Sequence, residues 1–163
     1  MHVELLIIIY HQIIFHMGTR HRGSLDEINA LNAFIKLQRA AESVSSRVHA
    51  VLPDGLTVTQ FGVLEAIHHI GPLCQSELAE KLLKSGGNLT LVVDNLEKAG
   101  YVARERDPAD RRFVVVKLTD KGQAFISALF PKVVTNVTRE MAALSSTELS
   151  DFGRLCKKIG LRS

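Results

Sequence analysis

From residue 25 onward, apolar residues recur along the chain at intervals of three and four, which is the pattern of amphipathic α-helices. Capping boxes of the type Ser/Thr-x-x-Glu/Gln precede three of these stretches, at Ser24–Glu27, Thr57–Gln60 and Ser145–Glu148. Pro131 falls inside the fifth stretch and is expected to kink it. The pattern predicts helices near residues 25–52, 57–70, 74–83, 88–99, 119–144 and 145–160.

Residues 102–119 interrupt the helical pattern and predict a β-hairpin. Val102–Arg106 and Phe113–Leu118 can form its two strands. Between them, Asp107-Pro108-Ala109-Asp110 has Asp at the first and Pro at the second position, as a type I turn prefers. We therefore expect a mainly α fold with a small β-hairpin.

The third and fourth predicted helices are short and are joined by a glycine-containing break, which is the arrangement of a helix-turn-helix. With an arginine-bearing hairpin after it, the segment predicts a winged helix, whose second helix (the recognition helix) fits the DNA major groove. The arginines suit a narrow minor groove. The expected DNA-binding residues in the break and on the recognition helix are Lys84, Ser85, Gly86, Gly87, Asn88, Thr90 and Leu91. Those on the hairpin are Arg104, Arg106, Asp110, Arg111 and Arg112.

Two of these assignments leave alternatives open. Gly86 and Gly87 fit a close approach of the backbone to DNA, but they also fit a simple turn. Asn88 fits bidentate pairing with adenine as well as helix capping.

Composition and charge narrow the function further. The chain is 46% hydrophobic and 23% charged, which is typical of a globular protein. Its net charge is +3, and the basic excess lies in residues 81–163, which makes a polyanionic partner plausible. The two cysteines are far apart, which excludes a disulfide-dense scaffold and a cysteine-based zinc site and suits a reducing compartment. No nucleophile elbow, phosphate loop or metal-spaced His/Glu cluster is present, so an enzyme is not expected.

The stretch from Leu73 to Gly122 resembles the MarR family of winged-helix transcription regulators. The shared features are Leu-Ala-Glu from Leu78, Val-Asp-x-Leu-Glu-x-x-Gly-Tyr-Val from Val93, Asp-x-x-Asp-Arg-Arg from Asp107 and Leu-Thr-x-x-Gly from Leu118. By this resemblance Asp110 and Arg112 match the family's wing motif, with Arg111 between them. The recognition helix and the segment after the wing look most like the branch that senses quinones and related oxidants.

The resemblance implies a homodimer that represses transcription from a pseudo-palindromic site on double-stranded DNA. A symmetric dimer places two recognition helices about 34–36 Å apart, on successive major-groove faces. A small phenolic, quinone-like or oxidant inducer is expected to release the DNA. In this plan residues 25–163 form the MarR-type domain, with a winged-helix core at 57–122 and dimerisation helices at 25–52 and 123–163. No cofactor and no membrane contact are expected, and the location is expected to be cytoplasmic.

Two other functions fit parts of the sequence. The first is a winged helix that binds protein and not DNA. The second is a thiol redox switch at Cys74, which stands at the expected N-cap of the third helix with Glu77 at the capping-box position. A helix N-terminus favours the thiolate, but a small residue tolerated at a cap is the favoured explanation of Cys74. The family's redox sensors often carry their thiol in the first helix, where this chain has none.

Residues 1–24 form an N-terminal extension of a different character. Residues 5–15 are the most apolar run of the chain, but they are too short to span a bilayer and lack the basic start of a signal peptide. Two interpretations stay open: translation starts at Met17, or the extension packs on a partner chain. Its histidines have no metal-site spacing.

Overall fold

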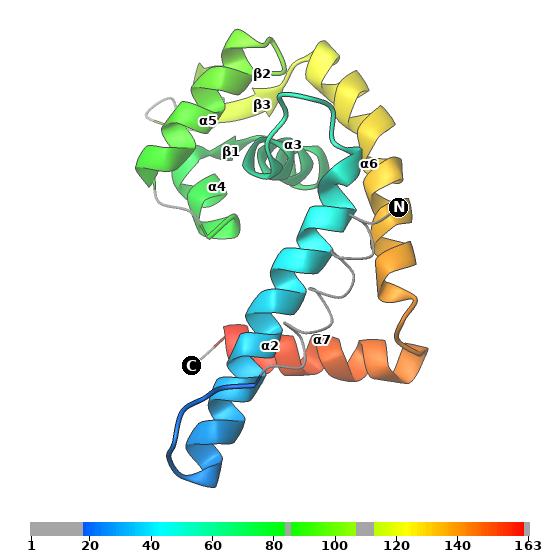
Figure 1. Ribbon diagram of the computed structural model, residues 1–163. Coiled ribbons are helices and arrows are strands. Elements are labelled where there is room, and N and C mark those ends of the chain that lie inside the picture. Colours follow the sequence, from blue (N-terminus) through cyan, green and yellow to red (C-terminus); the bar gives the residue numbers. More distant parts are fainter. Residues whose placement is uncertain (1–17, 84–85, 107–112, 162–163) are drawn as a thin grey trace. The chain divides into compact units, whose positions relative to one another are not determined.

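The computed structural model describes residues 18–83, 86–106 and 113–161 (Figure 1). The chain divides into two compact units, Met1–Val48 and His49–Ser163. The apolar run at 5–15 lies outside the described residues, as do five of the expected site residues, namely Lys84, Ser85, Asp110, Arg111 and Arg112. Within the described part of the chain, no helix combines the length and the apolar character needed to cross a membrane.

The first unit contains helix α2, Leu25–Val48, and its start confirms the expected capping box. The Ser24 amide donates to Glu27 Oε2 at 2.7 Å, and the Glu27 amide donates to Ser24 Oγ at 3.3 Å. The hydrogen bond from the Ser24 backbone, helped by the Ser24 hydroxyl, holds the pKa of Glu27 below its usual value. The apolar stripe of α2, which includes Phe34, remains largely exposed to solvent.

The second unit follows the expected order of elements. It contains η1 (His49–Val51), α3 (Val58–Ile70), β1 (Leu73–Cys74), α4 (Gln75–Lys81), α5 (Gly86–Lys98), β2 (Val102–Arg106), β3 (Val114–Leu118), α6 (Asp120–Met141) and α7 (Ser146–Gly160). The start of α5 differs from the sequence-based expectation, because the helix begins at Gly86 and both glycines belong to its first turn. Pro131 lies inside α6, as expected, and the helix continues for ten residues beyond it.

A small antiparallel sheet with the strand order β1-β3-β2 accompanies the helices. Val102 pairs with Leu118 and Arg106 with Val114, which confirms the predicted hairpin. The sequence did not predict β1, because two residues are too few for an alternating pattern. β1 nevertheless extends the sheet, since Leu73 pairs with Val116 on β3. β3 is therefore the central strand of the sheet, and β1 and β2 are its edge strands.

The core of the second unit draws on each of the helices α3 to α6 and on the sheet. The largest fully buried side chains are Leu64, Leu78, Leu89, Leu96, Ile126, Val63, Val93, Val102 and Val116. Burial of one such leucine or valine stabilises the fold by about 1.5–3 kcal/mol. This core fixes the rotation of α5 about its axis, and therefore determines which of its residues face outward.

The first turn of α6 packs directly on the backbone that leads into β2. The Thr119 hydroxyl caps α6 by accepting from the Gly122 amide at 3.0 Å, and it donates to the Gly100 carbonyl at 2.7 Å. Gly122 is buried, and a Cβ built on it would lie 1.9 Å from the Tyr101 carbonyl oxygen. Only glycine therefore fits at this junction.

The Gly122→Ala substitution is expected to lower the free energy of unfolding by about 1–3 kcal/mol, because the new methyl group forces α6 away from the Tyr101 backbone. Gly153→Ala on α7 is the matched control. Its Cβ would meet nothing within 4 Å, so the better helix propensity of alanine should raise stability by up to about 1 kcal/mol. Urea unfolding of both variants measures the two effects. Equal changes would contradict this account of the junction.

Candidate functional site

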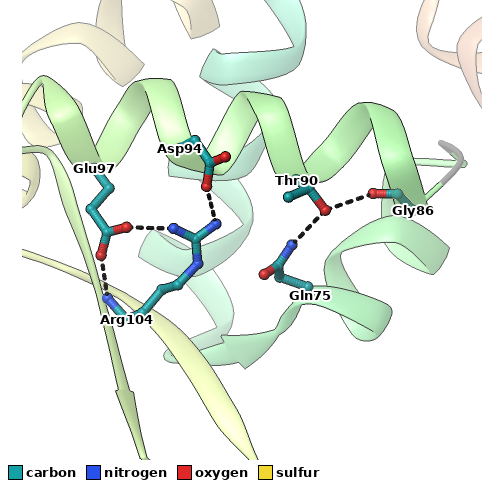
Figure 2. A network of polar contacts seen from close by, with 6 residues as sticks. All are labelled: Gln75, Gly86, Thr90, Asp94, Glu97 and Arg104. Atoms are coloured by element: carbon teal, nitrogen blue, oxygen red, sulfur yellow. Dashed lines mark hydrogen bonds and ion pairs between the residues drawn. The ribbon is translucent and has the colours of Figure 1, made fainter.

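The two short helices α4 and α5 form the expected helix-turn-helix, in the green part of the chain in Figure 1. Leu78 of α4 and Leu89 of α5 are both fully buried, so the two helices share the core of the second unit. Leu83, in the connection, has a positive φ of 50° and is exposed. A side-chain hydrogen bond at 3.2 Å from Gln75 to the Thr90 hydroxyl links the start of α4 to α5 (Figure 2).

The residues of α5 divide into three stripes with different surroundings. One stripe is buried and contains Leu89, Val93 and Leu96. A second stripe is polar, and each of its three members is bonded within the unit (Figure 2); it contains Thr90, Asp94 and Glu97. The third stripe is exposed and contains Gly87, Asn88, Leu91, Asn95 and Lys98. Leu91 of this stripe is 60% exposed.

Arg104 of β2 bonds to Asp94 and Glu97, two of the three members of the second stripe. Its guanidinium donates from Nη1 to Glu97 and, at 2.5 Å, from Nη2 to Asp94 Oδ1 (Figure 2). Its backbone amide also donates to Glu97 Oε1 at 3.0 Å. The side chain is 22% exposed. The structure therefore places Arg104, which was expected to face DNA, in contact with α5. Sequence reasoning had missed its partners and Gln75.

Charge and burial act in opposite directions on Arg104. Desolvation by burial lowers its pKa, but the hydrogen bonds and charges of Asp94 and Glu97 outweigh this, so that the pKa lies above its usual value. The guanidinium therefore stays charged at every pH at which the protein folds. Such a forked, charge-assisted contact is stronger than a hydrogen bond between neutral groups.

The rest of the hairpin carries charge toward its tip. Glu105 pairs with Lys117 across the two strands at 2.7 Å. Arg106 is exposed at the end of β2. The wing-motif residues Asp110, Arg111 and Arg112 lie outside the described residues.

Cys74 occupies the N-cap position of α4, as expected, and also forms part of β1. Its amide donates to Glu77 Oε2 at 2.8 Å. Its half-buried thiol lies 2.9 Å from the Ser76 hydroxyl, and both cysteines of the chain are free thiols. The capping interpretation accounts for these contacts.

A small open pocket of about 190 Å³ lies at the C-terminal end of α5. Asn95 and Gln60 line it together with Tyr101 and Phe125, whose ring centroids are 4.5 Å apart. The pocket combines aromatic walls with amide groups. An occupant would therefore contact the last turn of α5.

The chain is similar in sequence to known families and proteins. The sequence model of the MarR family matches residues 56–114. The HTH-type transcriptional regulator YkoM of Bacillus subtilis is 35% identical over 82% of this chain and 88% of its own length. MhqR, another such regulator of B. subtilis, is 30% identical over 82% and 93%.

Solved structures agree in fold. BpsR of Bordetella bronchiseptica, whose DNA binding is regulated by 6-hydroxynicotinic acid, aligns with a TM-score of 0.68 and 26% identity over 76% of this chain and 95% of its own. These relatives are transcriptional regulators and not enzymes.

Proposed function

The chain belongs to the MarR family of transcriptional regulators, and we propose that it binds a pseudo-palindromic operator in double-stranded DNA as a homodimer and represses transcription until a small aromatic signal releases it. The observation that carries the proposal is the exposed stripe of α5. That stripe offers amides, a methyl-rich side chain and an ammonium group, the chemistry that reads base edges and phosphates in a major groove. In this proposal Arg106, Arg111 and Arg112 of the wing contact the adjacent minor groove.

The two glycines at the start of α5 support the same surface. Neither has a positive φ, and a Cβ on either would meet nothing within 4 Å. Nothing within the described part of the chain therefore requires glycine at Gly86 or Gly87, although glycine weakens a helix. Close approach of a phosphate to the helix N-terminus supplies the reason, since its amide groups favour an anion there.

The apolar faces of the outer helices support a homodimer. α7 contains no buried residue, yet Phe152, Leu155 and Ile159 lie on one face of it and are 43%, 47% and 61% exposed. α2 and α6 also keep exposed apolar side chains, such as Phe34 and Val137. A second copy would cover these side chains, and a pair of recognition helices would meet two half-sites together.

The signal proposed here is a small phenolic or quinone-like compound. The similarity to BpsR, which responds to an aromatic hydroxy acid, supports this class, as does the aromatic and amide lining of the pocket beside Tyr101.

A redox switch of DNA binding at Cys74 stays a prediction. It would show as loss of DNA binding after peroxide treatment in the wild type and retention in Cys74→Ser.

We expect the protein to bind the duplex upstream of its own coding sequence, with an affinity that falls steeply with salt because phosphate contacts release counterions. Arg112→Ala should weaken binding and lower the slope of log affinity against log salt by about 1 per site. Arg154→Ala on α7, whose arginine pairs with Asp151, is the control. Fluorescence anisotropy at several salt concentrations measures this. Unchanged affinity of Arg112→Ala would remove the wing from the proposal.

Gly87→Ala should raise stability slightly and lower DNA affinity at the same time. The methyl group improves helix propensity by about 0.5–1 kcal/mol, but it stands where the phosphate approaches. Urea unfolding and anisotropy of the same samples separate the two effects. Gly153→Ala gains the same propensity and should bind DNA as the wild type does. Wild-type affinity in Gly87→Ala would show that the glycines form only the helix start.

Leu155→Glu should convert the dimer into monomers and weaken operator binding by more than tenfold, because a monomer meets only one half-site. Ser150→Glu introduces the same charge on the opposite, exposed face of α7 and should leave the dimer intact. Sedimentation velocity measures the state of both variants. A wild-type protein that is monomeric at micromolar concentration would contradict the dimer.

A further inference from the structure

We propose that Arg104 is a positioning residue that locks the wing onto the recognition helix, so that both reach the duplex as one rigid unit. This inference rests on the proposed function. It assigns to Arg104 a role other than phosphate contact, and it adds Asp94 and Glu97 to the residues that DNA binding requires.

The link between the wing and α5 begins at the outer edge of the sheet. β2 is an edge strand, so the backbone groups on its outer side have no neighbouring strand to bond. The Arg104 amide on this side donates to Glu97 Oε1, and the guanidinium of the same residue reaches the other oxygen of Glu97 (Figure 2). Main chain and side chain of one wing residue thus hold one carboxylate of α5.

Asp94 gives Arg104 a second point of contact on α5. Asp94 and Glu97 are three residues apart on one face of α5, and the fork of the Arg104 guanidinium reaches both. A lysine has a single ammonium on a flexible stem and cannot reproduce this planar fork. Contacts at two points of the helix restrain the wing from sliding along α5 and from tilting about either contact.

The same contacts also reduce the electrostatic repulsion between α5 and DNA. Two carboxylates on a helix that enters a polyanion's groove repel phosphate unless a cation compensates them. Arg104 compensates them in part and is itself only 22% exposed. It is therefore unsuited to a phosphate contact, in contrast to the exposed Arg106.

The test compares Arg104→Lys with the double variant Asp94→Ala/Glu97→Ala, which removes both acceptors of Arg104, on the same duplex by anisotropy. We expect Arg104→Lys to bind about tenfold more weakly although its charge is kept. We expect the double variant also to weaken binding, by about three- to tenfold, although it loses two negative charges. Arg104→Lys added to the double variant should cost little more, because both changes break the same link.

Glu105→Gln is the matched control, since Glu105 is the next residue of β2 but pairs with Lys117 within the hairpin. It should bind as tightly as the wild type or slightly more tightly. Thermal unfolding of each variant sets a temperature at which all are folded. Hydrogen exchange of the Arg104 amide, faster in the double variant than in Glu105→Gln, reports the link without DNA.

Two results would overturn the proposal: wild-type affinity in Arg104→Lys, or tighter binding in the double variant, as simple charge removal predicts. Exchange at the Arg104 amide that does not change in the double variant would overturn it as well. A wild-type protein that binds no duplex would instead refute the proposed function, while the exchange experiment would still decide whether the wing is locked to α5.

Discussion

The burial of one face of α5 constrains both of its other faces. Leu89, Val93 and Leu96 are held in a core to which α3, α4 and β2 contribute, and with 3.6 residues per turn this leaves the helix no freedom to rotate. The outward direction of Leu91 and the sideward direction of Asp94 follow from it. A change in this core would therefore redirect the exposed stripe and the polar stripe together.

The polar stripe shows why a count of charges does not locate a DNA surface. Residues 81–163 contain the whole basic excess of the chain, and Arg104 belongs to it. In the structure, however, its guanidinium bonds to Asp94 and Glu97. A cation bound in this way organises the site but adds little attraction for phosphate. In the proposed complex, exposed cations such as Lys98 would supply the long-range attraction.

Local features of the fold were predictable from the sequence, and features set by distant partners were not. Periodicity predicted the helix that became α5, and the capping rules predicted the starts of α3 and α7, since both signals lie within a few neighbouring residues. The sequence did not predict strand β1, because only its pairing with β3 defines it.

The same contrast between local features and features set by distant partners applies to the candidate site. The sequence predicted both Thr90 and Leu91 as DNA-binding residues, and helical spacing could not separate them. Their difference depends on Gln75, which is fifteen residues away from Thr90. The sequence likewise indicated a basic wing, but the destination of the Arg104 side chain depends on how β2 lies beside α5.

The start of α5 illustrates a conflict between stability and function. Two successive glycines cost a helix about 0.5–1 kcal/mol each relative to alanine, out of the 5–15 kcal/mol that a domain of ordinary stability has. At Gly122 a backbone contact inside the chain explains the glycine, because a methyl group has no room. At Gly86 and Gly87 there is room, and the backbone needs no special conformation. Among the described residues nothing explains this cost, and the phosphate proposed at the helix N-terminus would account for it.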